Sequence, residues 1–217
     1  NTSMAPTYRP SAAEITKGSI SLTLTSTGNG GCIAVTDIVI ITINPAPIVD
    51  AGADAFVCSN NPNFNLNGTI TNATGGIWSG GSGSFTPSIT NLNAIYNPTP
   101  AEIFTGGITL TLTSTGNGNC IAVNNTVFIT FTPSPTADAG SNQSVCANNP
   151  NVYLSASTTV ATGGLWSGGL GSYNPDNTSL NAVYSPTAAE ISNGNVTLTL
   201  TTTGNGNCIA VSDNMTV

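Results

Sequence analysis

Five cysteines are the residues of this sequence with the clearest chemical potential, and their spacing is regular. Cys32, Cys120 and Cys208 follow one another at intervals of 88 residues, and Cys146 follows Cys58 at the same interval. Cysteine thiols can bind a metal ion or form disulfides. Zinc sites built from cysteine usually contain closely spaced pairs or added histidines, and this sequence has no His and no Cys-x-x-Cys pair. The pattern therefore favours disulfides, provided that the chain is secreted.

Two pairings of the five cysteines fit the interval of 88 residues. In the first, Cys58 pairs with Cys120 and Cys146 with Cys208, and Cys32 has a partner upstream. In the second, Cys32 pairs with Cys58 and Cys120 with Cys146, and Cys208 remains. The first pairing is favoured because a bond inside one domain stabilises that domain whatever its neighbours do. The second pairing would join adjacent domains into a stiff rod.

The charged residues are too few for most other chemistry. The chain of 217 residues has nine acidic and two basic residues and no His, so the commonest general base is missing. A net charge of −7 cannot neutralise a phosphate backbone, which argues against a nucleic-acid partner. No apolar run approaches the roughly 20 residues of a membrane-spanning helix. The composition predicts a protein that is not an enzyme and that has no membrane span.

Three aspartates are weak candidates for calcium ligands. Asp50, Asp54 and Asp138 lie just after proline-rich linkers, where some adhesive arrays bind calcium between domains. Calcium takes six to eight oxygen ligands, usually including several carboxylates. Because Asn142 replaces Asp54 in the next copy of the sequence, solvated turns are the favoured interpretation. No cofactor is predicted, and calcium is the only metal that these residues would suit.

The spacing of the cysteines belongs to a repeat that runs through the whole sequence. The segment TLTSTGNGNCIAV at 111–123 recurs as TLTTTGNGNCIAV at 199–211. Linkers containing Pro-x-Pro, at 44–48 and 132–136, separate the copies. The sequence therefore divides into three domains: residues 1–45 form the C-terminal half of a repeat, residues 46–133 a complete repeat, and residues 134–217 a nearly complete one. We call them the half-repeat, the first repeat and the second repeat. This division predicts a segment of a longer array.

Each repeat reads as an all-β sandwich. Apolar residues alternate with Thr over 108–113, and the strand runs into Thr115-Gly-Asn-Gly118, which predicts a tight hairpin turn. About seven short strands fit into 88 residues, as in an immunoglobulin-like sandwich. The aromatic residues that recur between the two repeats are expected in the cores, and they are Trp78, Trp166, Tyr96 and Tyr184.

Short helical turns are expected between the sandwich strands. A Ser or Thr followed three residues later by Glu fits a capping box, in which the two side chains satisfy backbone N–H groups at the helix start. Three such pairs occur at equivalent positions, and they are Ser11 with Glu14, Thr99 with Glu102 and Thr187 with Glu190. These glutamates are therefore predicted to be structural and not catalytic.

Several segments resemble the PKD-like, immunoglobulin-fold repeats of very large surface proteins of Bacteroidota. They are DAGADAFVC (50–58), GGIWSGGSGSF (75–85), NAIYNPTPAEI (93–103) and ITLTLTSTGNGNC (108–120). The sequence has Trp78-Ser79-Gly80-Gly81 where the family usually has an aspartate-bearing motif. The resemblance implies an extracellular stalk or filament, exported by type IX secretion in the gliding-motility adhesins, without catalytic residues.

Two functions follow as hypotheses. The first is a structural spacer in a cell-surface adhesin or gliding filament, whose partners are neighbouring repeats of the same chain, with surface glycans or other filament strands as further partners. The second is a polysaccharide-binding accessory module of a secreted protein. A binding module would present exposed aromatic platforms, whereas both Trp residues lie in core-like contexts. The sequence therefore favours the spacer.

Overall fold

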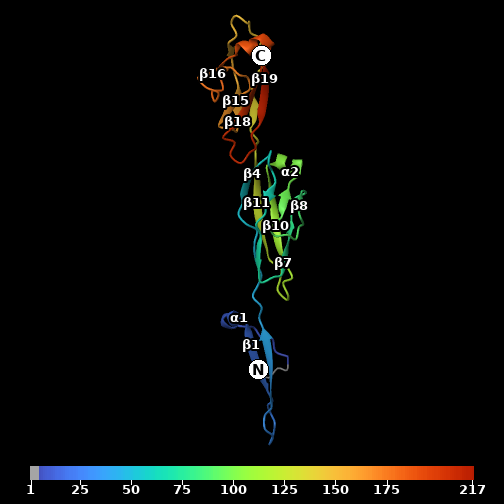
Figure 1. Cartoon of the computed structure of the whole chain (residues 1–217). Helices are drawn as coiled ribbons and strands as arrows, with labels where there is room; N and C mark the ends of the chain where they lie inside the picture. The colour runs from blue at the N-terminus through green and yellow to red at the C-terminus, as the bar shows by residue number, and fades with distance from the viewer. Residues whose placement is uncertain (1–4) are drawn as a thin grey trace.

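The computed structural model describes residues 5–217 and arranges them as three β-rich bodies in a row (Figure 1). The half-repeat lies at one end and contains α1 (Ala12–Lys17), β1 (Ser19–Thr25) and β2 (Thr36–Thr42). Strands β1 and β2 pair antiparallel and form a sheet of two strands. No helix among the described residues is long and apolar enough to cross a membrane.

The first repeat is an immunoglobulin-like β-sandwich with a four-stranded sheet in the order β4-β11-β10-β7. Strand β4 runs parallel to β11, and the other neighbours in this sheet are antiparallel. The smaller sheets are β5-β9-β8 and β3-β6. The elements are β3 (Ile48–Asp50), β4 (Ala55–Cys58), β5 (Phe64–Asn65), β6 (Thr69–Thr71), β7 (Gly75–Ser79), β8 (Ser84–Thr86), β9 (Ile95–Asn97), α2 (Pro100–Thr105), β10 (Gly107–Thr115) and β11 (Asn124–Thr132).

The second repeat has the same architecture with one strand fewer. Its sheets have the orders β15-β18-β19, β13-β17-β16 and β12-β14. The elements are β12 (Thr136–Asp138), β13 (Val152–Tyr153), β14 (Ser157–Thr159), β15 (Gly163–Ser167), β16 (Ser172–Asn174), β17 (Val183–Ser185), α3 (Ala188–Asn193), β18 (Thr197–Thr203) and β19 (Ser212–Thr216).

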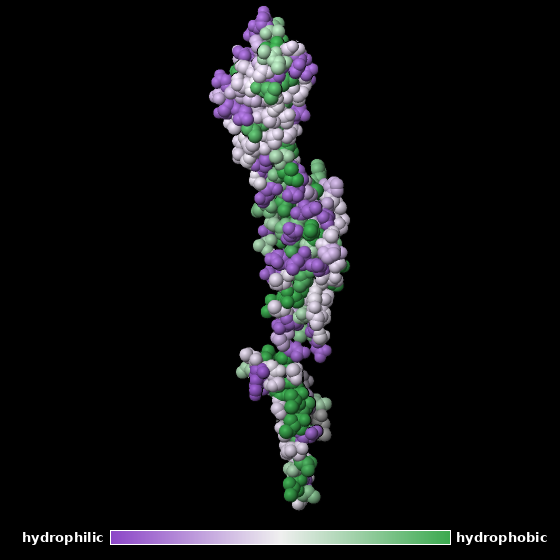
Figure 2. All heavy atoms as spheres, in the orientation of Figure 1, coloured by the Kyte–Doolittle hydropathy of each residue, from purple (hydrophilic) through white to green (hydrophobic). Residues whose placement is uncertain are grey.

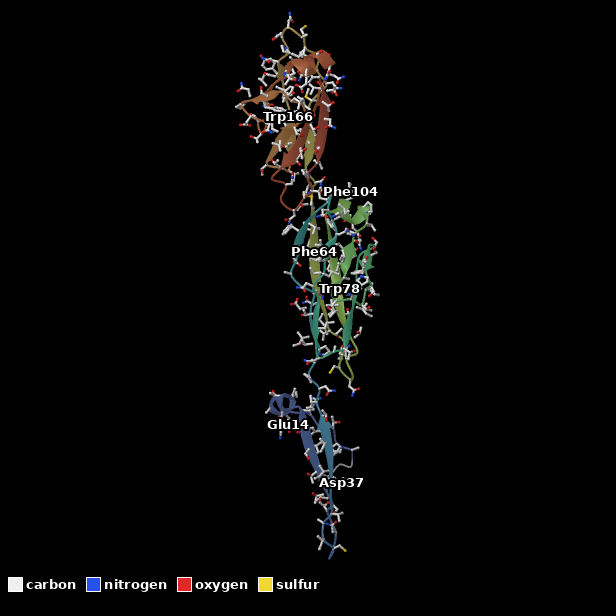
Figure 3. All side chains as sticks on the ribbon, in the orientation of Figure 1. Glu14, Asp37, Phe64, Trp78, Phe104 and Trp166 are labelled. Carbon is white, nitrogen blue, oxygen red and sulfur yellow. A yellow bond between two sulfur atoms is a disulfide. The ribbon has the colours of Figure 1, made fainter. Side chains whose placement is uncertain are left out.

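Each of the two repeats encloses a core around one tryptophan. Trp78 and Trp166 are at most 1% exposed and lie inside their sandwiches (Figure 3). Their indole N–H groups donate to the backbone carbonyls of Leu92 and Leu180. Tyr96 and Tyr184 are fully buried beside them, so all four aromatic residues predicted in the core lie there.

The turn after the long Thr-rich strand differs from the sequence prediction. The tight hairpin turn predicted at Thr115–Gly118 is instead an eight-residue loop, since β10 ends at Thr115 and β11 begins at Asn124. Positive φ angles occur at Gly116 (65°) and Gly118 (60°), on either side of Asn117, so Asn-Gly does not form the two-residue turn. The first repeat also has nine strands, β3–β11, where about seven were predicted, because several strands are only two or three residues long.

One turn of the second repeat holds a β-branched residue in the left-handed region. Val160 has φ 65°, whereas the equivalent Asn72 has φ 59° and donates its side-chain N–H to the Ala46 carbonyl at 3.0 Å. Because left-handed backbone costs an L-residue about 1–2 kcal/mol and Asn tolerates it best, we expect Val160→Asn to raise the free energy of unfolding by about 1 kcal/mol. Urea unfolding measures this change. Asn72→Val is the matched variant in the first repeat and should lower the free energy of unfolding by a similar amount. Variants with the same free energy of unfolding as the wild-type protein would contradict the prediction.

Candidate functional site at the repeat junction

A disulfide joins the first repeat to the second. Cys58 and Cys208 are bonded, although they are separated by 150 residues in the sequence. The bond lies at the narrow junction between the two sandwiches, where Figure 3 draws it as a yellow link. The predicted pairs Cys58–Cys120 and Cys146–Cys208 are therefore wrong, and so is the alternative of Cys32–Cys58 with Cys120–Cys146.

The first partner, Cys58, is held at the end of an ordered strand. Strand β4 pairs with β11 so that Cys58 lies opposite Thr132, the last residue of β11. A tight turn follows, in which the N–H of Asn61 donates to the Cys58 carbonyl at 3.0 Å and the N–H of Ser59 donates to the Thr132 carbonyl at 2.9 Å. These contacts hold the buried Cys58 at the edge of the first repeat that faces the second.

The second partner, Cys208, lies on the long loop between β18 and β19. The N–H of Cys208 donates to the Asn205 carbonyl at 3.0 Å, and the Asn205 side chain donates to the Thr202 carbonyl at 3.1 Å. The loop is closed by mutual bonds between Thr202 and Val211. Because the loop extends beyond the end of its own sandwich, Cys208 reaches the previous repeat and not the interior of its own. The eight-residue loop that replaced the predicted tight turn is thus the physical reason for the different pairing.

Side-chain amides extend the contact around the disulfide. The Asn60 side chain donates to the Ile209 carbonyl at 2.9 Å and accepts from the Ile209 N–H at 3.1 Å. Asn207 donates to the Phe56 carbonyl at 3.5 Å. Both sulfurs lie close to the carbonyl oxygen of Pro133 in the linker, at 3.8 Å for Cys58 and 3.7 Å for Cys208. The contacts of Asn60 and Asn207 were not predicted from the sequence. The one signal for Asn60 is its place two residues after Cys58, in a segment that recurs after Cys146.

The other three cysteines, Cys32, Cys120 and Cys146, are free thiols. Cys120 lies on the loop of the first repeat that is equivalent to the loop of Cys208, and it has the same contacts within that loop. Its sulfur is 3.7 Å from the Pro45 carbonyl oxygen. Cys120 therefore lies at the junction between the half-repeat and the first repeat. This position is equivalent to that of Cys208 at the junction between the first and second repeats.

The predicted capping boxes form in all three copies of the sequence, at Ser11 with Glu14, Thr99 with Glu102 and Thr187 with Glu190. In the first repeat one carboxylate oxygen of Glu102 accepts from the N–H and hydroxyl of Thr99 at 2.7 and 3.0 Å. The other oxygen accepts from the Ser82 N–H at 2.6 Å and from the Tyr96 hydroxyl at 2.8 Å. The buried tyrosine thereby ties the helix start to the core.

These hydrogen bonds change the acidity of both partners. Burial alone would raise the pKa of the Glu102 carboxyl, but the N–H groups of Thr99 and Ser82 and the Tyr96 hydroxyl lower it from 4.5 to about 2. Burial and the hydrogen bond to Glu102 raise the pKa of Tyr96 to about 12. The equivalent pair Glu190 and Tyr184 has the same directions of shift. The glutamates are thus kept ionised for a structural purpose.

We expect Glu102→Gln to lower the free energy of unfolding of the first repeat by roughly 1–3 kcal/mol, because buried N–H groups lose their charged acceptor. The effect should depend on pH. Since the carboxyl pKa is lower in the folded state, its stabilisation is complete above about pH 4.5 and is lost as the pH falls from 4.5 to about 2. Urea unfolding between pH 2 and 7 measures both effects. The control is Glu14→Gln on the exposed α1, and an equal loss in both variants would contradict the prediction.

The three aspartates considered as weak calcium ligands contact backbone N–H groups. Asp50 and Asp138 accept from Gly52 and Gly140, each at 2.9 Å, in short turns. Asp54 accepts from the Phe128 N–H at 2.7 Å and connects β4 to β11. Within residues 5–217, no three His, Cys, Asp or Glu side chains gather in a group that could hold a metal ion.

Comparisons with known proteins give similarity of structure without similarity of sequence. No protein-family model and no curated protein match the sequence. The structure is similar to extracellular cadherin domains 1–4 of protocadherin gamma B7, at 13% sequence identity and a TM-score of 0.40, over 94% of this chain and 57% of that one. It is also similar to Drosophila N-cadherin EC1-4, at 11% identity and a TM-score of 0.40, over 84% and 51% of the two chains. Immunoglobulin domains 1–5 of Sidekick-1 match at 12% identity and a TM-score of 0.36, over 88% and 45%.

This chain therefore spans between 45 and 57% of the length of those three structures.

Proposed function

We propose that the chain is a stiff structural spacer in an extracellular adhesin or filament. One observation carries the proposal: the Cys58–Cys208 disulfide joins two sandwiches whose other covalent connection is a short, proline-containing linker. A covalent bond beside the linker gives two connections between the same two bodies. Two connections restrict both bending and twisting, as a spacer requires.

The chemistry of the junction supports an extracellular location. Disulfides persist in oxidising surroundings such as the cell surface and are rare in the cytosol. The asparagine contacts at the junction are uncharged, so salt does not screen them as it screens ion pairs. The resemblance to the surface proteins of Bacteroidota extends the proposal to a type IX-secreted adhesin, where a row of stiff repeats would hold a binding tip away from the cell and could act in gliding.

The alternative function as a polysaccharide-binding module has less support. Carbohydrate-binding platforms need exposed aromatic rings, and both tryptophans are at most 1% exposed. Phe56, Phe104 and Tyr153 are exposed, but none of them is aromatic at the equivalent position of the other repeat, so they form no repeated platform. The tyrosines equivalent to each other in the two repeats, Tyr96 and Tyr184, are buried as well.

Small-angle X-ray scattering of the oxidised and reduced protein tests the spacer function. We expect one elongated conformation to fit the scattering of the oxidised chain. Reduction of the disulfide should require an ensemble of bent shapes, because only the linker and a few hydrogen bonds then connect the two repeats. The Cys146→Ser variant is the control for a change at a free thiol. Identical scattering before and after reduction would contradict the role of the disulfide in stiffness.

A further inference from the structure

The disulfide closes a ring of the chain that contains most of the first and second repeats. Residues 59–207 lie inside this ring, and the Cα atoms of Cys58 and Cys208 at its ends are 5.0 Å apart. While the bond is intact, unfolding of the ring cannot draw these two residues apart. Figure 2 shows that the two repeats meet at a narrow waist, so a pulling force passes between them mainly through the bond and the linker.

The segment that leads to Cys58 is already extended in the folded protein. Residues 51–58 run beside β11 in the same direction and keep in step with it. At the start of the segment, the Ala51 N–H donates to the Asn125 side chain at 3.1 Å. At its end, Cys58 lies opposite Thr132. Both contacts join residues 74 positions apart, and so does a hydrogen bond between them. The segment therefore covers the length of an extended strand with the same number of residues, and it has little slack.

This segment runs along the whole first repeat. The chain enters the first repeat beside the loop of Cys120, whose sulfur is 3.7 Å from the Pro45 carbonyl oxygen. Strand β4 then ends with Cys58 at the opposite end, next to the second repeat (Figure 1). Residues 46–58 therefore connect the two ends of the first repeat directly.

The path continues through the second repeat along another extended strand. Shortly after Cys208, the Val211 carbonyl accepts from the Thr202 N–H at 2.9 Å, and β19 then pairs antiparallel with β18. Figure 1 shows β19 leading away from the junction toward the C-terminus at the far end of the second repeat. A force on the two ends of the chain thus has a continuous covalent path through residues 46–58, the disulfide and residues 208–217.

Tension speeds unfolding only when unfolding lengthens the path that bears the tension, because the work done is the force multiplied by the gain in length. Forced unfolding is governed by the rate of unfolding. With the bond intact, the path is already extended and residues 59–207 lie outside it, so unfolding of either core gains little length. Without the bond the ring joins the path, and its separation of 150 residues corresponds to about 500 Å of fully extended chain.

We propose that the Cys58–Cys208 bond makes the chain a load-bearing element, in which tension passes along residues 46–58 and 208–217 and bypasses the rest of both cores. The inference rests on the proposed spacer function, because a spacer that ties two points together is pulled at its ends. Stiffness resists bending, whereas this load path keeps the first and second repeats folded under tension. The two properties are distinct and can be measured separately.

Optical-tweezers measurements on the whole chain test this load path, with one DNA handle attached to each terminus. At constant force, we expect the oxidised protein to release no unfolding step from the first or second repeat. Cys58→Ser, and the wild-type protein after reduction, should each release steps that add about 500 Å of contour length in total. The half-repeat lies outside the ring and contributes the same extension in every case. Cys146→Ser keeps the bond and should behave like the oxidised wild-type protein.

A second attachment point keeps the bond and moves the load. In the double variant Cys32→Ser and Cys120→Ser, one handle is attached to the exposed thiol of Cys146 and the other to the N-terminus. The force then acts on a residue inside the ring, so the second repeat should unfold although the bond is intact. The shorter way round the ring, from Cys208 back to Cys146, is 62 residues (208 − 146), which limits the step to at most about 200 Å.

Unfolding steps from both repeats in the oxidised protein pulled at its termini would overturn the proposal. The absence of steps in the reduced protein or with the handle at Cys146 would also overturn it, because the cores would then resist tension without the bypass. Scattering separates this proposal from the spacer function. A stiff oxidised chain that unfolds stepwise when it is pulled at its termini would refute the load path alone, whereas identical scattering before and after reduction would refute the role in stiffness alone.

Discussion

Replacement of Cys58 with Ser is expected to lower the free energy of unfolding of the oxidised protein by about 4–5 kcal/mol. The disulfide closes a loop of 150 residues across the junction, and a cross-link of this kind stabilises mainly by restricting the unfolded chain. When only the first repeat unfolds, its residues after Cys58 still form a closed loop tethered to the folded second repeat. The stabilisation should therefore reach each repeat and not only the junction. Urea unfolding of the oxidised wild-type and variant proteins measures it.

The matched control is Cys146→Ser. Cys146 is the equivalent cysteine of the second repeat and is a free, exposed thiol, so its replacement should change the stability by less than about 0.5 kcal/mol. A reducing agent should remove the difference between the wild-type protein and Cys58→Ser. If Cys58→Ser and Cys146→Ser had equal free energies of unfolding under oxidising conditions, the disulfide would not stabilise the protein and the prediction would be wrong.

The second large effect is expected from Trp78→Ala, which should destabilise the first repeat by about 3–5 kcal/mol. Trp78 is at most 1% exposed, belongs to the apolar core of the first repeat and donates its N–H to the Leu92 carbonyl. Its removal loses this burial, leaves a cavity and removes one of the two donors to the Leu92 carbonyl, which still accepts from the Gly68 N–H. The second repeat has its own core around Trp166 and should keep its own stability.

Fluorescence can separate the two repeats because the protein has only two tryptophans. In Trp78→Ala the remaining Trp166 reports on the second repeat, and circular dichroism reports on both. We expect the fluorescence transition to occur at a higher urea concentration than the first circular dichroism transition. Trp166→Ala is the reciprocal variant and should reverse this order. A single coincident transition in both variants would show that the repeats unfold as one unit.

Features that depend on neighbouring residues could be predicted from the sequence. The capping boxes need only a hydroxyl and a carboxylate three residues apart. The core positions of Trp78 and Trp166 were predicted from their recurrence at equivalent positions of the two repeats. The role of Tyr96 as a donor to Glu102 was not predicted, since it depends on the contact of a strand with the following helix. That contact could be inferred only from the common interval between Tyr and Glu in the three copies.

The disulfide could not be predicted because it depends on how two repeats meet. The favoured pairing placed each bond inside one sandwich, and the alternative joined adjacent repeats but through Cys120 and Cys146. The eight-residue loop instead carries Cys208 to the linker and to Cys58 of the previous repeat. The odd number of cysteines leaves one over under either pairing and so could not distinguish them.

Non-reducing peptide mapping tests most directly that a disulfide fixes the two repeats to each other. The protein is purified with its thiols blocked, digested with pepsin at low pH to prevent exchange, and analysed by mass spectrometry before and after reduction. We expect a peptide that links Cys58 to Cys208, together with alkylated Cys32, Cys120 and Cys146. A peptide that links Cys58 to Cys120, or an alkylated Cys208, would contradict the covalent junction.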